Sequence, residues 1–226
     1  VDFGVTGFDV VSERRGDNGD VMVIHDALGF GGCMLSLAVP EAWTDVQEIG
    51  DLQRKAKSLS APLRVATKYP VLTGRFLQER GITAELISAE GTLETAPTIG
   101  YADMICDIVS SGQTLRDNRL RPLKGGMVVK SESVLIANRR SLMENPKALD
   151  TARTLLEFFE ARLRADRNLA IFANIRGDSP EAIAKRIFNE CDISGLQGPT
   201  VSRVVVREQE QNWYAVNIIV QRNQII

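Results

Sequence analysis

The residues from Asp107 to Leu115 combine an acid, three hydroxyl side chains and a glycine at one turn of the chain. An apolar, β-prone run, Met104 to Val109, stops at Ser110-Ser111-Gly112, and Gln113 opens a segment that is expected to be helical. Such a strand, turn and helix start directs backbone N–H groups outward beside hydroxyls, and the helix dipole adds partial positive charge. This arrangement suits a phosphate. The acid just upstream suits sugar hydroxyls, so the pattern indicates a phosphorylated sugar as ligand.

Two other segments carry groups that suit phosphorylated ligands. Glu94 precedes Asp107 in a loop-forming stretch, Gly91 to Pro97. Acids at the carboxyl ends of neighbouring strands converge where α/β sheets usually bind ligands. Lys68 and Tyr69 end a short strand-like run with a cation and an aromatic ring, which suit a nucleotide phosphate and base. Each feature alone is also typical of a solvated loop, so the prediction rests on their combination.

The composition indicates an ordinary globular chain. Its 226 residues are 44% hydrophobic and 25% charged, and its net charge is −2. A chain of this length buries a core and has room for about two or three small domains. Its charge provides no general attraction for nucleic acid or anionic membrane, and no apolar run approaches the ~18 residues of a membrane span. We therefore expect a cytoplasmic protein without nucleic-acid or membrane partners.

The histidine and cysteine content argues against a metal centre built on these residues. His25 is the only histidine, and Cys33, Cys106 and Cys191 lie far apart in the sequence. Structural zinc sites need several such ligands at short spacings. The cysteines are expected to be free thiols in a reducing compartment.

Short strand-like runs alternate with helical segments, which is typical of an α/β fold with largely parallel sheets. The expected strands cover residues 1–7, 21–24, 33–39, 63–67, 85–88, 104–109, 127–129 and 133–137. The expected helices cover residues 42–59, 70–80 and 149–163. Near residue 165 the organisation changes. A strand at 169–175, a helix to 189 and strands at 201–206 and 213–220, with a charged turn at 207–212, resemble a ferredoxin-like module.

The order of these segments resembles the ATP phosphoribosyltransferase family. The matching stretches are Val1–Gly7, Phe30–Ala38, Ala66–Pro70, Gly91–Pro97, Gly100–Leu115 and Ser131–Asn138. Residues 173–177, 196–200 and 213–216 are similar to the start of the C-terminal regulatory domain of the long, histidine-regulated form.

The resemblance implies an α/β fold with two periplasmic-binding-protein-like lobes, as in a type IV phosphoribosyltransferase, and a partial C-terminal ferredoxin-like α+β regulatory domain. The implied first catalytic lobe, which is incomplete, comprises residues 1–34 and 120–166. The second lobe, with the phosphoribosyl-binding loop, comprises 35–119, and the partial regulatory domain 168–226. The family normally begins with a further strand and a Pro-Lys-Gly-Arg-like loop. The chain is therefore expected to be truncated at both ends and to have little or no turnover alone.

The implied reaction transfers the phosphoribosyl group of phosphoribosyl pyrophosphate to N1 of ATP and releases pyrophosphate, the first step of histidine biosynthesis. Glu94 and Asp107 are the implied catalytic residues, and they are also the implied ligands of ribose hydroxyls or Mg²⁺, directly or through water. The implied phosphoribosyl pyrophosphate ligands are Asp107, Ser110, Ser111, Gly112, Gln113 and Thr114. Lys68 and Tyr69 are the implied nucleotide-binding residues. This chemistry requires positioning and charge stabilisation rather than a covalent nucleophile.

The resemblance also implies partners. Histidine is the feedback inhibitor in the family, Mg²⁺ is the expected cofactor, and a homo-oligomer, either a hexamer or a dimer, is the expected assembly.

Two alternatives remain open from the sequence. A two-lobed binding protein for a phosphorylated metabolite needs the turn but gains nothing from two carboxylates near an anion, because they raise the electrostatic energy unless hydroxyls or Mg²⁺ offset them. A catalytically inactive regulatory subunit predicts histidine binding and assembly without turnover.

Overall fold

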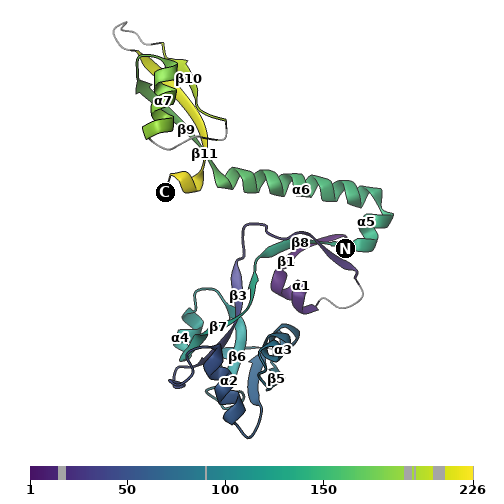
Figure 1. Cartoon of the computed structure of the whole chain (residues 1–226). Helices are drawn as coiled ribbons and strands as arrows, with labels where there is room; N and C mark the ends of the chain where they lie inside the picture. The colour runs from purple at the N-terminus through teal and green to yellow at the C-terminus, as the bar shows by residue number, and fades with distance from the viewer. Residues whose placement is uncertain (15–18, 90, 191–194, 196, 206–211, 226) are drawn as a thin grey trace. The chain divides into compact units, whose positions relative to one another are not determined.

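The computed structural model describes residues 1–14, 19–89, 91–190, 195, 197–205 and 212–225. The chain divides into two compact units, Val1–Thr151 and Ala152–Ile226 (Figure 1). Cys191 and residues 207–211 of the expected charged turn lie outside the described residues. Within the described ranges, no helix combines the length and the hydrophobicity that a membrane span requires.

The larger sheet of the first unit has five strands in the order β5-β4-β6-β3-β7. Their bounds are Cys33–Pro40 (β3), Leu63–Thr67 (β4), Ala84–Ser88 (β5), Met104–Val109 (β6) and Leu120–Ser131 (β7). β4 is parallel to β5 and β6, whereas β3 is antiparallel to β6 and β7. The expectation of largely parallel sheets is therefore wrong. A helix between two strands makes them parallel only where the two strands are neighbours, as β4 and β5 are; α2 (Ile49–Ser58) joins β3 to β4, which are not adjacent in the sheet.

Each face of this sheet is covered by different elements. The elements that cover it are α2 (Ile49–Ser58), α3 (Pro70–Glu79), the 3₁₀ helix η1 (Leu93–Thr95) and α4 (Gln113–Asp117). α2 and α3 pack on the face that carries Val65 and Cys106. η1 and α4 pack on the face that carries Ile105. Because successive strand side chains point to opposite faces, Asp107 lies on the same side as Ile105, towards η1 and α4.

Among the expected elements of the first unit, α2 and β7 differ most from their expected bounds. α2 begins at Ile49 rather than at 42, where the Asp51 carboxylate accepts a hydrogen bond from Glu48 N (3.0 Å). This contact stabilises a helix start, because the first N–H groups of a helix have no partner within it. β7 covers twelve residues rather than three, with register shifts against β3 that accommodate the two glycines at 125 and 126.

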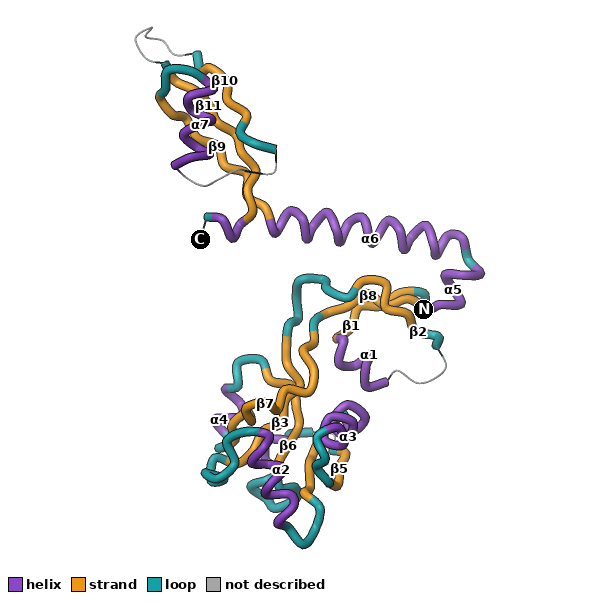
Figure 2. Tube along the Cα trace, viewed as in Figure 1, coloured by secondary structure: helices purple, strands orange, loops and turns teal. Residues whose placement is uncertain are grey.

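The smaller sheet of the first unit is antiparallel, in the order β1-β8-β2. Its strands are Phe3–Gly7 (β1), Val21–His25 (β2) and Ser133–Asn138 (β8), and the helices α1 (Phe8–Arg14) and α5 (Arg139–Glu144) follow β1 and β8. Only Glu132 separates β7 from β8, so one nearly continuous run of chain passes from the larger sheet into the smaller one (Figure 2).

The second unit contains an antiparallel sheet in the order β10-β11-β9. Its elements are β9 (Asn168–Arg176), α7 (Pro180–Glu190), β10 (Thr200–Arg203), β11 (Trp213–Gln221) and η2 (Arg222–Gln224). The boundary between the units falls within α6 (Pro146–Arg167). The order of β9, α7, β10 and β11 confirms the predicted strand-helix-strand-strand order. Ile183 of α7 packs with Tyr214 and Val216 of β11. β10 ends at Arg203, before the expected bound of 206, and residue 206 itself lies outside the described part.

Candidate functional site

The predicted site segments meet at one edge of the larger sheet. β4 and β6 are adjacent and parallel, with Thr67 opposite Cys106, so their carboxyl ends lie at the same edge. Lys68 and Tyr69 directly follow β4, and the turn at 110–112 directly follows β6. β5, on the other side of β4, is parallel as well and leads towards η1. The topology therefore brings together three segments that are far apart in the sequence.

Glu94 and Asp107 lie near one another at this edge. Buried Leu93 anchors η1 to the sheet, which leaves the neighbouring Glu94 half-buried. Burial raises the pKa of the Asp107 carboxyl above its usual range, and the charge of Glu94 raises it further. The Ile108 N–H, which donates to Asp107 Oδ1 at 2.8 Å, and the charge of Lys68 oppose this rise. Two acids and a cation thus share one electrostatic environment.

The turn between β6 and α4 is built around a glycine in the left-handed conformation. Gly112 is the N-cap of α4 and has a φ of 70°, in the left-handed region that glycine adopts readily. The Gln113 N–H donates to Ser111 Oγ at 3.3 Å. Buried Leu115 anchors the short helix. The side chains of the predicted phosphate ligands Ser110, Ser111, Gln113 and Thr114 are exposed, and Gly112 is half-buried.

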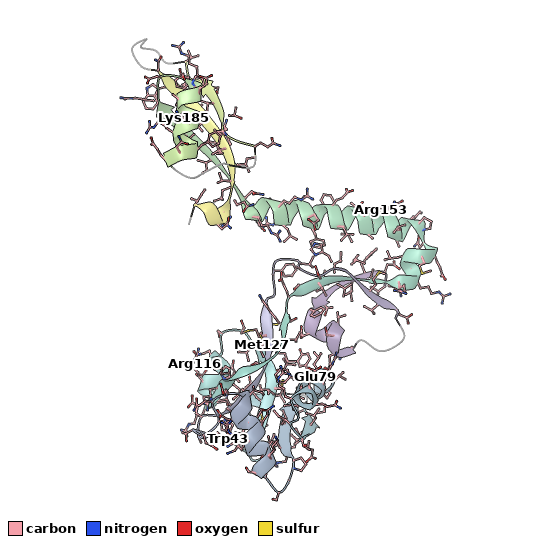
Figure 3. All side chains as sticks on the ribbon, viewed as in Figure 1. Trp43, Glu79, Arg116, Met127, Arg153 and Lys185 are labelled. Carbon is pink, nitrogen blue, oxygen red and sulfur yellow. The ribbon has the colours of Figure 1, made fainter. Side chains whose placement is uncertain are left out.

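Arg116 adds a cation to this turn that sequence reasoning did not include. Its Nη2 donates to Ser111 O at 3.3 Å and to Gln113 Oε1 at 2.9 Å. Figure 3 labels Arg116 on α4. The spacing of Arg116 from Gly112 could have indicated this contact, because a residue four positions after the N-cap lies one helical turn further along, on the same side of the helix. The guanidinium keeps further donors, which suit a phosphate.

Tyr69 forms a hydrogen bond with a residue of α1 that the sequence did not indicate as its partner. Its backbone N–H donates to Thr67 Oγ1 at 3.0 Å, and its hydroxyl donates to Asp9 Oδ2 at 2.6 Å. Burial raises the pKa of the Tyr69 phenol, and the hydrogen bond to Asp9 raises it further. Lys68, next to it, is exposed. Asp9 lies in α1, on the smaller sheet, so this contact joins the two sheets of the first unit.

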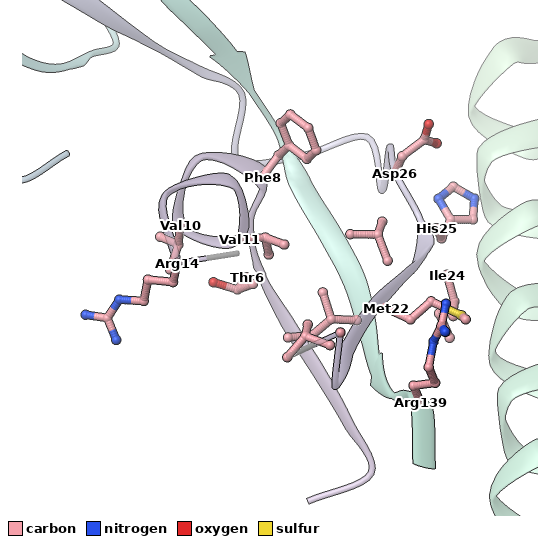
Figure 4. A pocket seen from close by; sticks show the side chains of 14 residues that line it. Thr6, Phe8, Val10, Val11, Arg14, Met22, Ile24, His25, Asp26 and Arg139 are labelled. Carbon is pink, nitrogen blue, oxygen red and sulfur yellow. The ribbon is translucent and has the colours of Figure 1, made fainter. Parts of the chain in front are cut away.

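A separate hollow of about 870 Å³ lies against the smaller sheet (Figure 4). Its lining includes Phe8, Val11, Met22, Ile24 and Ile136, with Arg14 and Arg139 at its margin. None of the predicted site residues lines it. The hollow is therefore distinct from the edge where the acids and the turn meet.

Comparison with known protein families gives the family of this chain. Residues 1–160 match the profile described as ATP phosphoribosyltransferase, and residues 165–226 match the profile described as HisG, C-terminal domain. The chain belongs to the ATP phosphoribosyltransferase family. This confirms the resemblance that its motifs indicate.

Individual ATP phosphoribosyltransferases support the assignment. ATP phosphoribosyltransferase 1, chloroplastic, of Arabidopsis thaliana is 40% identical over 97% of this chain and 55% of its own length. The enzyme of Methanococcus maripaludis strain DSM 14266 is 34% identical over 99% of this chain and 70% of its own length. The chain thus spans about half of the plant relative. The solved ATP phosphoribosyl transferase (HisG:HisZ) complex from Thermotoga maritima is similar over 71% of each chain, with a TM-score of 0.56 and 24% identity. This likeness confirms the α/β fold class.

Proposed function

We propose that this chain is an ATP phosphoribosyltransferase or the corresponding part of one. It would transfer the phosphoribosyl group of phosphoribosyl pyrophosphate to N1 of ATP, releasing pyrophosphate in the first step of histidine biosynthesis. The observation that carries the proposal is the meeting of Glu94, Asp107 and the turn at 110–114 at the carboxyl ends of β4 and β6.

The turn would bind the 5′-phosphate. The backbone around Gly112, the hydroxyls of Ser110, Ser111 and Thr114, the Gln113 amide and the Arg116 guanidinium offer donors at one place. A phosphate accepts several such hydrogen bonds, and the donors of a positively charged guanidinium are the strongest. The turn would therefore fix one end of the sugar.

Glu94 and Asp107 would hold the ribose hydroxyls, directly or through water. Positioning the anomeric carbon against adenine N1 lowers the barrier, because the entropy of bringing the reactants together is already lost on binding. Carboxylates near a carbon that gains positive charge in the transition state stabilise it electrostatically. Both roles need acceptors rather than a nucleophile, and a pair of half-buried carboxylates provides them.

The same two carboxylates fit Mg²⁺, which is usually held by one or two carboxylates together with substrate phosphates. Burial of Asp107 and the charge of Glu94 beside it disfavour the ionised form of Asp107, and a bound cation would relieve that cost. When bound, Mg²⁺ would neutralise charge on the leaving pyrophosphate. Lys68 and Tyr69 would bind ATP, with the cation towards its phosphates and the ring towards its base.

The remaining roles concern regulation and location. The C-terminal unit would bind histidine as feedback inhibitor and take part in a homo-oligomer, a hexamer or a dimer. The expected cytoplasmic location stays a prediction, and the two Arabidopsis relatives are named as chloroplastic.

Calorimetric titration of the chain with phosphoribosyl pyrophosphate tests the proposal. We expect binding that strengthens at least tenfold when Mg²⁺ is added. Asp107→Asn should remove the effect of Mg²⁺. The control is Asp26→Asn, a change of an exposed acid that directly follows β2, and it should leave the effect intact. Binding that is indifferent to the metal would favour a phosphate-binding protein without chemistry, and no binding at all would contradict the assignment of the turn.

A further inference from the structure

α1 carries two acids, Asp9 and Glu13, and each of them contacts the segment after β4. They are four residues apart, so they lie on the same face of the helix. Glu13 accepts hydrogen bonds from the N–H groups of Val71 and Leu72, at 2.8 Å and 2.9 Å. These groups belong to the first turn of α3, where N–H groups lack partners within the helix and the dipole favours a negative charge. Glu13 therefore fixes the start of α3.

Asp9 fixes the residue just before that helix. Its Oδ2 accepts from the Tyr69 hydroxyl at 2.6 Å, and its Oδ1 accepts from Ser131 Oγ. Ser131 Oγ in turn accepts from the Asp9 N–H at 3.0 Å. Asp9 is only 5% exposed. A buried carboxylate with all these partners has little freedom, because breaking any one of them leaves a charged group without compensation.

Gly7 makes room for this carboxylate. A Cβ at Gly7 would lie 2.2 Å from Asp9 Oδ1, so only glycine permits the carboxylate to fold back over the end of β1. The turn from β1 into α1 thus determines where Asp9 points. It directs the carboxylate towards Tyr69, across the boundary between the two sheets of the first unit.

We propose that α1 acts as a clamp on residues 68–72, and that Asp9 is a positioning residue for nucleotide binding that works through Tyr69. The proposal rests on the proposed function, in which Lys68 and Tyr69 contact ATP. Since the Tyr69 hydroxyl is engaged by Asp9, the ring face is the part of Tyr69 available to a base. Holding the phenol at one end fixes the plane of the ring and removes rotamer freedom that binding would otherwise have to restrict.

The clamp itself is tested without any nucleotide. Hydrogen exchange followed by mass spectrometry should show at least tenfold faster exchange of the Val71 and Leu72 amides in Glu13→Ala than in the wild type. Spectrophotometric titration of the three tyrosines, with Tyr69→Phe identifying the signal, should show that Asp9→Asn lets the Tyr69 phenol ionise at lower pH. Asp26→Asn should change neither measurement. Unchanged exchange in Glu13→Ala together with an unchanged titration in Asp9→Asn would overturn the clamp.

The positioning role is tested by titrating ATP, and separately phosphoribosyl pyrophosphate with Mg²⁺, into the full chain. Asp9→Asn and Tyr69→Phe should each weaken ATP binding about tenfold, and the double variant should weaken it no further, because residues that act through one contact are not additive. Affinity for phosphoribosyl pyrophosphate should stay unchanged. Ser131→Ala removes one partner of Asp9 and should give a smaller loss of ATP affinity. This variant replaces Asp9→Asn in the test if Asp9→Asn does not fold.

The outcomes separate the two proposals. The positioning role would be overturned if the double variant Asp9→Asn/Tyr69→Phe weakened ATP binding by the product of the two single losses. It would also be overturned if ATP affinity were unchanged in both Asp9→Asn and Ser131→Ala. If the wild-type chain binds no ATP, the nucleotide part of the proposed function fails and the positioning role falls with it. The exchange and titration measurements then still decide whether α1 is a clamp.

Discussion

Asp107 and Glu94 form a pair of neighbouring carboxyl groups in which the burial of Asp107, and then the charge of Glu94, raise the pKa of Asp107. Folding therefore favours the protonated form of Asp107, and ionisation of this carboxyl lowers the stability of the folded chain. Sites that bind cations or polar ligands often retain such a cost to stability, because the ligand offsets it.

This relationship predicts that Asp107→Asn stabilises the free chain at neutral pH. When folding raises the pKa of a carboxyl, its ionisation destabilises the folded state at pH values above the folded pKa. Below the unfolded pKa of about 4 the carboxyl is neutral in both the folded and the unfolded state, so this effect disappears. The variant should raise the melting temperature at pH 7 by about 2–4 °C, the shift that about 1 kcal/mol produces in a chain of this size. The gain should fade as the pH falls towards 4, as thermal denaturation from pH 4 to 8 would show. A loss of stability at pH 7 would contradict the prediction.

Asp103→Asn should have the opposite effect. Burial acts to raise the pKa of Asp103, but the hydrogen bonds from the Arg64 side chain and backbone, with the Arg64 charge, outweigh it and leave the pKa lowered. Nη2 of Arg64 lies 2.8 Å from Asp103 Oδ1. This stability is present above the unfolded pKa and is lost as the pH falls through the folded one. Because the pair is partly exposed, we expect a modest fall in the melting temperature at pH 7, of about 2–4 °C. A fall at pH 3 as large as the fall at pH 7 would refute this explanation.

Gly112→Ala should weaken binding of phosphoribosyl pyrophosphate at least tenfold. A Cβ at this position would lie 3.3 Å from Arg116 Nη1, so the guanidinium would be pushed away from the turn. Gly81→Ala is the matched control, since Gly81 has a φ of 62° and nothing within 4 Å of its added Cβ. Both variants should lose about 1–2 kcal/mol of stability from the left-handed backbone. Equal ligand affinity in the two variants would remove the turn from the site.

Arg116→Gln should weaken binding of phosphoribosyl pyrophosphate about tenfold. The change keeps a polar side chain but removes the charge and the fork of donors that reaches Ser111 O and Gln113 Oε1. Arg119→Gln removes an exposed cation three residues away and should leave affinity within about twofold. Calorimetry at two salt concentrations would separate a specific contact from general charge. Equal losses in both variants would indicate only a general electrostatic effect.

Ile183→Ala should destabilise the second unit by about 2–5 kcal/mol, because it leaves a cavity in the core of that unit. Ile183 is 1% exposed and packs with Tyr214 and Val216. Phe172→Ala is the control: that side chain on β9 is 76% exposed, so its removal should change stability by only about 0.5 kcal/mol. Chemical denaturation monitored at Trp213 measures both. A similar loss for both variants would show that the outer face of the sheet is covered in solution.

The sequence predicts the strands that carry the site better than the strands around them. Leu63–Thr67 and Met104–Val109 have the expected bounds, because these mostly buried strands are short, largely apolar runs that end at turn residues. The first half of β7 was missed, since Pro122 and the glycines at 125 and 126 are unusual in a strand. β7 lies at the edge of the described sheet, where such residues are tolerated.

The site was predictable where its residues follow strand ends, and unpredictable where they depend on tertiary contacts. Lys68, Tyr69 and the turn at 110–114 are found next to the strand ends that the pattern indicates. Asp9 was not singled out, because its partner Tyr69 lies 60 positions away in the sequence and the contact joins elements of different sheets. Nothing in the local pattern of β1 and α1 indicates which distant side chain the carboxylate meets.

The connection between the two sheets has a consequence for the order of folding. All five strands of the larger sheet lie between Cys33 and Ser131, whereas β1 pairs with β8 across the whole of that segment. Closing so long a loop is entropically unfavourable. Once β3 and β7 have paired, Cys33 lies opposite Ser131. The loop that pairing of β1 with β8 must then close is much shorter. We therefore expect pulsed hydrogen exchange to show β4 and β6 protected before β1 and β8. During synthesis, β1 emerges long before β8 exists, so the smaller sheet is the last part of the first unit to form.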